Sequence, residues 1–214
     1  MGGGNLFHTK ASMIALADCN NFFVSCERVF NPRIRNKPAV VLSNNDGCVI
    51  SRSDEAKALG IKMGHPAFKN RNIFEKHNVT IFSTNFALYG DFSNRVMSVL
   101  AEAIPRIEIY SIDEAFLDYS GLPEPMEHAR DIRNKVMQYT GIPVSIGIAR
   151  TKTLAKVANR IAKKEVKSGV FHLHCQDDIQ DCLKKLPVSK LWGVGWRYAQ
   201  RLELYGIRTA YELT

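Results

Sequence analysis

Three carboxylates stand at points where strands are predicted to end, and carboxylates are the side chains that bind divalent metal ions. Asp18 follows the apolar run of residues 13–17, which is typical of a buried strand. Asp113 and Glu114 follow the alternating stretch of residues 107–110, at the turn of a predicted hairpin. If these strands are neighbours, the carboxylates meet at one sheet edge, where a cation must offset their repulsion.

Magnesium suits such a set, because it prefers oxygen ligands and takes others from water and phosphates. Two such ions can activate a 3′-hydroxyl and stabilise a leaving pyrophosphate. The alternative is that the Asp-Glu pair lies in a solvated turn and that Asp18 caps the following helix. Spacing alone leaves both interpretations open.

A strongly basic helix is predicted from Thr151 to about Lys164, with Leu154, Ala158 and Ile161 facing inward. Its opposite face carries five cations, namely Lys152, Lys156, Arg160, Lys163 and Lys164. A basic helix face is usually only solvated. Beside the carboxylates, it would instead supply the cations that a triphosphate needs.

Composition narrows the classes of protein that fit. The 214 residues carry a formal net charge of +8, which favours a polyanionic partner such as nucleic acid. No apolar run approaches the roughly 20 residues that span a bilayer, so no membrane association is expected. Five cysteines without a CxxC pair argue against a disulfide framework or a zinc site and favour the reducing cytoplasm.

The predicted element order from Met13 is strand, helix, an inserted region over roughly 24–90, helix, hairpin, helix, strand and helix. This order favours an α+β fold with a split βαβ (ferredoxin-like) sheet covered on one face by helices. The insertion predicts a small α/β lobe with a hairpin turning at Asp46-Gly47. Arg52 and Lys57 of this lobe are further candidates for triphosphate contacts.

A third segment begins past Gly169 and contains Gly193 and Gly195, followed by a helical pattern. This pattern resembles a helix-hairpin-helix, whose glycines let backbone N–H groups approach a DNA phosphate. A simple turn between two helices is the alternative. Trp192 and Trp196 are interpreted as packing residues.

Together these residues resemble the Y-family of translesion polymerases, and the resemblance covers nearly all of residues 13–214. It rests on three motifs in order: Asp18-Cys19-Asn20-Asn21-Phe22-Phe23, then Ser111-Ile112-Asp113-Glu114-Ala115-Phe116, then Gly147-Ile148-Ala149 with Lys152-Thr153-Leu154-Ala155-Lys156. Within the family, residues 43–52 and 55–60 are most similar to the UmuC branch.

The resemblance implies a palm over residues 13–23 and 88–168, fingers over 24–87, and a partial helical thumb over 169–214. Residues 1–12 are then a leader or tag remnant. The family's little-finger domain has no counterpart in the sequence, which suggests a truncated chain.

The resemblance also implies residue roles. Asp18, Asp113 and Glu114 would bind two Mg²⁺ ions, helped by the backbone carbonyl of Cys19, with Asp113 and Glu114 as the catalytic pair. Phe23 would be a steric gate against ribose. The nucleotide-binding residues implied are Phe22, Phe23, Ser51, Arg52, Lys57 and Lys163, and the DNA-binding residues are Gly193 and Gly195.

One string departs from a related branch of the family. The DinB-like branch has Tyr-Glu-Ala-Arg where this chain has Asp54-Glu55-Ala56-Lys57. Lys57 would take the place of the arginine, whereas Asp54 cannot replace the contact of the tyrosine. Binding of the nucleotide is therefore expected to differ from that in the DinB-like branch.

The implied activity is template-directed DNA synthesis past lesions in SOS mutagenesis and repair, on primed template DNA with deoxynucleoside triphosphates. Implied partners are a processed UmuD-like dimer, the RecA filament and the sliding clamp. A nucleotidyl-cyclase-like enzyme would instead show a glycine-rich hairpin in place of Ser111-Ile112. A DNA-binding module with a degenerate palm would lack a carboxylate, and none is missing.

Overall fold

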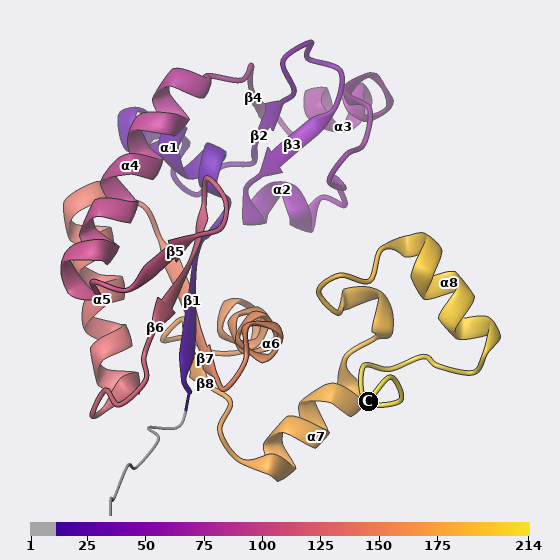
Figure 1. Cartoon of the computed structure of the whole chain (residues 1–214). Coiled ribbons are helices and arrows are strands. Elements are labelled where there is room, and N and C mark those ends of the chain that lie inside the picture. Colours follow the sequence, from indigo (N-terminus) through magenta and orange to yellow (C-terminus); the bar gives the residue numbers. More distant parts are fainter. Residues whose placement is uncertain (1–11) are drawn as a thin grey trace, which may run out of the picture.

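The computed structural model describes residues 12–214, so the predicted leader falls outside the described residues except for Ser12. Its main sheet has the strand order β5-β6-β1-β7-β8 (Figure 1). The strands are β1 (Ile14–Cys19), β5 (Ile107–Ile109), β6 (Glu114–Asp118), β7 (Val144–Ala149) and β8 (Val170–His172).

The topology confirms the predicted split βαβ sheet. Strands β1 and β5 are both antiparallel to β6, which lies between them, so they run parallel to each other. The long helix α4 (Phe86–Ala103) is followed along the chain by β5. On the other side, β1 pairs with β7 antiparallel, and β8 extends the sheet parallel to β7.

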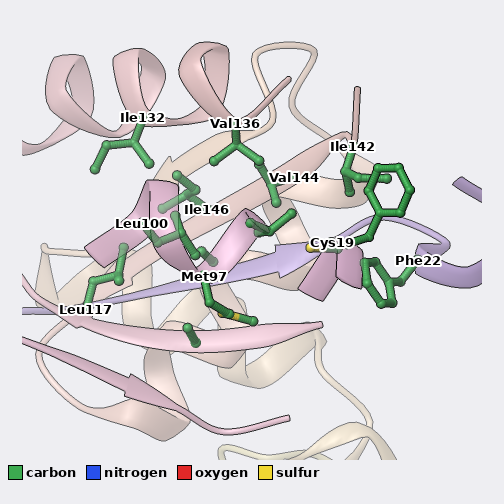
Figure 2. Packing of buried hydrophobic residues seen from close by; sticks show 14 of the residues in the cluster. Cys19, Phe22, Met97, Leu100, Leu117, Ile132, Val136, Ile142, Val144 and Ile146 are labelled. Carbon is green, nitrogen blue, oxygen red and sulfur yellow. The ribbon is translucent and has the colours of Figure 1, made fainter. Parts of the chain in front are cut away.

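The prediction that helices cover only one face of this sheet is wrong. Helices α4 and α5 (Pro125–Thr140) pack on one face, where Leu100, Ile132 and Val136 meet strand residues (Figure 2). Helix α6 (Lys152–Lys164) packs on the other (Figure 1). All of β7 is therefore buried.

The alternation of side chains along β1 decides which residues meet α6. Ala15, Ala17 and Cys19 belong to the core beneath α4 and α5, whereas Leu16 belongs to the core beneath α6. Because side chains alternate along a strand, Asp18 points to the α6 side with Leu16. The basic helix thus lies over the face that carries Asp18.

Helix α6 lies unusually close to the sheet at Gly147 of β7. A Cβ atom at Gly147 would stand 2.0 Å from the backbone nitrogen of Asn159 and 2.5 Å from the carbonyl oxygen of Ala155. Only small side chains fit such an interface, so Ala155, Ala158 and Ala162 are buried. Of the predicted inward residues, Ala158 is fully buried, and Leu154 and Ile161 are partly buried and pack against the same core.

Substituting Gly147→Ala is expected to lower the free energy of unfolding by about 1–3 kcal/mol or more, because the backbone of α6 must move away. The matched control is Gly90→Ala in α4, where an added Cβ meets nothing within 4 Å. That change is expected to be neutral or to stabilise by up to about 1 kcal/mol. Urea unfolding measures both, and a Gly147→Ala protein as stable as the wild type would contradict the packing described.

The inserted region forms the predicted small lobe around a second sheet of order β3-β2-β4. Its buried cluster includes Val40, Val49 and Phe74, while Val24 and Val41 join the main core. The elements are α1 (Phe22–Phe30), β2 (Ala39–Leu42), β3 (Val49–Arg52), α2 (Asp54–Ala58), α3 (Arg71–Lys76) and β4 (Thr80–Phe82).

The C-terminal segment contains α7 (Gln176–Lys185), a 3-10 turn (Val188–Lys190) and α8 (Trp196–Leu204). Leu183, Leu186 and Ala210 join the core beneath α6, so this segment packs on the same face of the sheet as α6. Among residues 12–214, no helix is long and apolar enough to cross a membrane.

Candidate active site

The strand register brings two of the predicted carboxylates face to face. Asp18 near the end of β1 stands directly opposite Glu114 at the start of β6. The third, Asp113, lies in the turn before β6, where its backbone carbonyl accepts a hydrogen bond from the N–H of Cys19 at 2.9 Å. The Ser111 hydroxyl donates to Asp113 Oδ1 at 2.8 Å and so orients that side chain. One sheet edge therefore carries all three acidic groups.

Two lysines of α6 pair with these carboxylates. Lys156 Nζ lies 2.8 Å from Glu114 Oε2, and Lys163 Nζ pairs with Asp18 Oδ1. The side chains of Lys156 and Glu114 are only 17% and 19% exposed, so this pair is poorly screened by water. The basic face of α6 is therefore more than a solvated surface.

Burial raises the pKa of Asp18 to about 7, opposed by Lys163 and reinforced by the charges of Glu114 and Asp113. The pKa of the Cys19 thiol is raised well above its usual value, mainly by burial. Its side chain belongs to the core beneath α4 and α5, on the face of β1 opposite Asp18. At Cys19, only the backbone carbonyl remains available as a ligand.

The raised pKa of Asp18 predicts how stability depends on pH in the absence of divalent ions. Between the usual value of 3.8 and about 7, the folded state binds more protons than the unfolded state. The stability that Asp18 contributes is therefore lost as the pH rises through this window. Relative to Asp18→Asn, the wild type is expected to lose about 1–2 kcal/mol between pH 5 and pH 8. Chemical unfolding in EDTA measures this difference, and pH profiles that run parallel would contradict it.

The donor set fits a hard divalent cation, since it offers three carboxylates and a backbone carbonyl, all of them oxygen ligands. The ligand atoms of the three carboxylates do not all lie within 4.8 Å of one another, however. Within the described residues, the one group of three potential ligands whose atoms all lie within 4.8 Å of one another is His174, Cys175 and Asp178. Asp18 and Glu114 instead each hold an ammonium group, so a metal ion would have to displace both lysines.

Beside the carboxylates lies a cleft of about 280 Å³ between the main sheet and the small lobe. The structure brings together most of the predicted site residues here, namely Asp18, Cys19, Phe22, Phe23, Ser51, Arg52, Lys57, Asp113 and Lys163. Glu114 lies outside this lining, in a neighbouring hollow that Asp18, Lys156 and Lys163 also line. The cleft therefore joins acidic groups to cations from two lobes.

The residues of the small lobe are held in place in different ways. Phe23 stacks on Tyr89, with ring centroids 4.5 Å apart. Arg52 donates to the carbonyl of Ile61, while its buried Nε has no hydrogen-bond partner. Lys57 donates to Asp54 Oδ1 at 2.8 Å, so Asp54 takes part in the site through Lys57.

The two predicted DNA-binding glycines lie apart from this cleft. Gly193 has a φ of +88°, and an added Cβ at Gly193 or Gly195 would meet nothing within 4 Å. Their backbone is thus open to an approaching group. The residue before them, Trp192, packs on Tyr110 and Phe116 as predicted, whereas Trp196 is 66% exposed and does not serve as a packing residue.

The sequence did not identify several residues that complete the site. Asn21, Ile50 and Met63 also line the cleft. Lys156 is predicted on the basic helix face and in the third motif, but without its carboxylate partner. Asn21 lies within the first motif, which is the one local signal for it. The pairing of Lys156 with Glu114 joins positions 42 residues apart and has no local signal.

Comparison with known proteins assigns this architecture to a family. The family model described as "impB/mucB/samB family" matches residues 17–160, and the chain belongs to this family. A second model, "IMS family HHH motif", matches residues 176–207 and confirms the predicted helix-hairpin-helix.

The most similar relatives include the protein UmuC of Salmonella typhimurium, which is 49% identical over 207 residues. The aligned part is 94% of this chain and 49% of that protein, so the chain spans about half the length of the curated relatives it matches. DNA polymerase IV of Picrophilus torridus is 32% identical, over 91% of this chain and 57% of that protein.

Solved structures agree with this assignment. An insertion ternary complex of Dbh DNA polymerase superposes with a TM-score of 0.80 at 32% identity, covering 92% of this chain and 58% of that one. DinB from Sulfolobus solfataricus gives a TM-score of 0.78 at 32% identity, with the same coverage. The fold is therefore that of the palm and fingers of Y-family polymerases.

Proposed function

We propose that this chain carries the catalytic palm and fingers of a template-directed DNA polymerase for translesion synthesis. The observation that carries the proposal is the single cleft in which Asp18 and Asp113 face Arg52, Lys57 and Lys163. Membership of the family and the likeness to polymerase complexes support it.

In this proposal Asp18, Asp113, Glu114 and the carbonyl of Cys19 would hold magnesium ions. When bound, two such ions supply activation of the primer 3′-hydroxyl and stabilisation of the leaving pyrophosphate. Lys163, which pairs with Asp18, would be available to bind the triphosphate if a metal ion took its place at Asp18. The half-buried Arg52 and the solvent-facing Lys57 would bind the remaining phosphate oxygens from the small lobe.

We propose that Phe22, Phe23 and Ser51 line the part of the cleft that receives the sugar and the base of the nucleotide. Phe22 and Ser51 are buried and form the wall of the cleft, whereas Phe23 is partly exposed within it. A ring fixed by stacking on Tyr89 would exclude a ribose 2′-hydroxyl by steric conflict.

A cationic region supports binding of a polyanion near the cleft. The pKa of Lys164 is lowered chiefly by Arg160, then by burial and by the charges of Lys190 and Lys57. These cations come from α6, from α2 and from the turn before α8, so three segments contribute to one positive surface. Together with the open glycines at 193 and 195, it is the proposed path of the DNA backbone.

By analogy with UmuC, we further propose a cytoplasmic role in SOS mutagenesis, with a processed UmuD-like dimer, the RecA filament and the sliding clamp as partners. These proposals rest on family membership alone.

Primer extension on templates that differ in one templating base tests the proposed function. Low salt and high protein concentration favour binding to the DNA backbone. We expect Mg²⁺-dependent addition of the complementary deoxynucleotide. A second preparation joins the chain to the remaining half of Salmonella UmuC. Absence of extension in both, or turnover of nucleotide without primer and template as in a cyclase, would contradict the proposal.

A further inference from the structure

An aromatic cage surrounds the ammonium group of Lys156. Its Nζ lies 4.7 Å from the ring centroid of Tyr110, 5.2 Å from that of Trp192 and 5.9 Å from that of Phe116. The faces of aromatic rings attract cations, most strongly when the cation is desolvated. Lys156 is therefore held both by these rings and by Glu114.

The cage is assembled from two distant parts of the chain. Tyr110 and Phe116 flank the carboxylate hairpin, whereas Trp192 belongs to the segment just before Gly193. The indole N–H of Trp192 donates to the Tyr110 hydroxyl at 3.3 Å, and the rings of Tyr110 and Trp192 meet edge to face. One ring of the cage, that of Trp192, thus comes from the helix-hairpin-helix segment.

We propose that Trp192 is a positioning residue that holds Lys156 on Glu114 and thereby couples the helix-hairpin-helix segment to the metal-binding carboxylates. The inference rests on the proposed function, in which a divalent cation binds Glu114. Because Lys156 and that cation compete for the same carboxylate, whatever holds Lys156 in the cage weakens cation binding.

The coupling has a direction. DNA that binds at Gly193 and Gly195 and draws Trp192 away would release Lys156 and free Glu114 for the cation. Coupling between two binding sites is reciprocal, so cation binding would equally favour the DNA-bound position of Trp192. Assembly of the metal site would then be favoured when primed template is present.

Binding of Mn²⁺ in the absence of DNA tests this coupling without measuring activity. We expect Trp192→Leu to bind Mn²⁺ about three- to tenfold more tightly than the wild type, the size of one partly desolvated cation–π contact. The matched control is Trp196→Leu, because Trp196 is the other of the two tryptophans and has no contact with Lys156. That variant is expected to keep the wild-type affinity.

A double-mutant cycle separates positioning from a general loss of structure. Lys156→Met removes the competing charge and is expected to tighten Mn²⁺ binding, and adding Trp192→Leu is then expected to change nothing further. In Trp196→Leu, where Trp192 is the sole tryptophan, Mg²⁺ is expected to shift the emission over the same concentration range. Trp192→Phe, which keeps a ring but loses the N–H bond, gives an intermediate affinity and replaces Trp192→Leu if the latter does not fold.

Two results would overturn the inference. The first is that Trp192→Leu binds Mn²⁺ with the same affinity as the wild type, while Asp113→Ala abolishes binding. This result would leave the proposed metal site intact but would remove the role of Trp192. The second is an equal effect of Trp192→Leu with and without Lys156. Mn²⁺ binding that is insensitive to Asp113→Ala would overturn the proposed function itself.

Discussion

Replacing Asp113 with Asn is expected to lower the single-turnover rate of primer extension by at least about a thousandfold. Asp113 is the carboxylate best placed to receive a metal ion, since within residues 12–214 it forms no ion pair, whereas Asp18 and Glu114 each hold a lysine. The carboxamide keeps the size of the side chain and can still accept from Ser111, but it loses the negative charge that a cation requires.

The control for Asp113→Asn is Asp131→Asn, at an exposed position of α5 on the opposite side of the sheet. It removes the same charge and is expected to leave the rate unchanged. Affinity for primed DNA, measured by fluorescence anisotropy, is expected to be similar in all three proteins. Extension by Asp113→Asn at the rate of the control would show that the carboxylate hairpin is not the catalytic site.

Replacing Phe23 with Ala is expected to lower the preference for deoxyribonucleotides over ribonucleotides by about a hundredfold or more. The ring of Phe23 lies in the cleft and is fixed by its stacking on Tyr89, so it cannot turn aside for a 2′-hydroxyl. Removing it opens the space that the hydroxyl would occupy.

The measurement for Phe23 is the ratio of kcat/KM values for a deoxynucleotide and its matching ribonucleotide. Phe23→Tyr, which retains the ring, is the control and is expected to preserve the ratio. If Phe23→Ala also preserved it, another residue of the cleft would have to act as the gate.

Four strands of the main sheet could be predicted because each carries a local signal, whereas the three-residue strand β8 was not predicted. The apolar run before Asp18 and the hairpin around Asp113 and Glu114 both lie where expected. The coverage of the second face could not, because an amphipathic helix such as α6 shows which side is buried but not against what. Gly147 is the residue that allows α6 to pack closely on this face. A single small residue in a strand does not predict such packing, which becomes evident only because the backbone of Asn159 lies against it.

Helix α4 shows a similar limit, since the inserted region is predicted to run to about residue 90 whereas the helix begins at Phe86. Its first turn is fixed by Asn85, whose side chain accepts from the N–H of Leu88, and Gly90 weakens the helical signal in between.

For the site, sequence motifs predicted which side chains meet, but not how their charges are balanced. The pairing of Lys163 with Asp18 spans 145 positions, and the cage around Lys156 draws on residues from 110 to 192. Such contacts follow from the register of β1 against β6 and from the placement of α6, both of which are nonlocal.

The most direct test of the central claim is an anomalous difference map from crystals grown with Mn²⁺ and a non-hydrolysable deoxynucleotide. We expect manganese bound by Asp18, Asp113 and Glu114, with Lys163 moved from Asp18 to the triphosphate. Manganese at His174, Cys175 and Asp178 but absent from the three carboxylates would show that the ion had reached the protein and would contradict the claim.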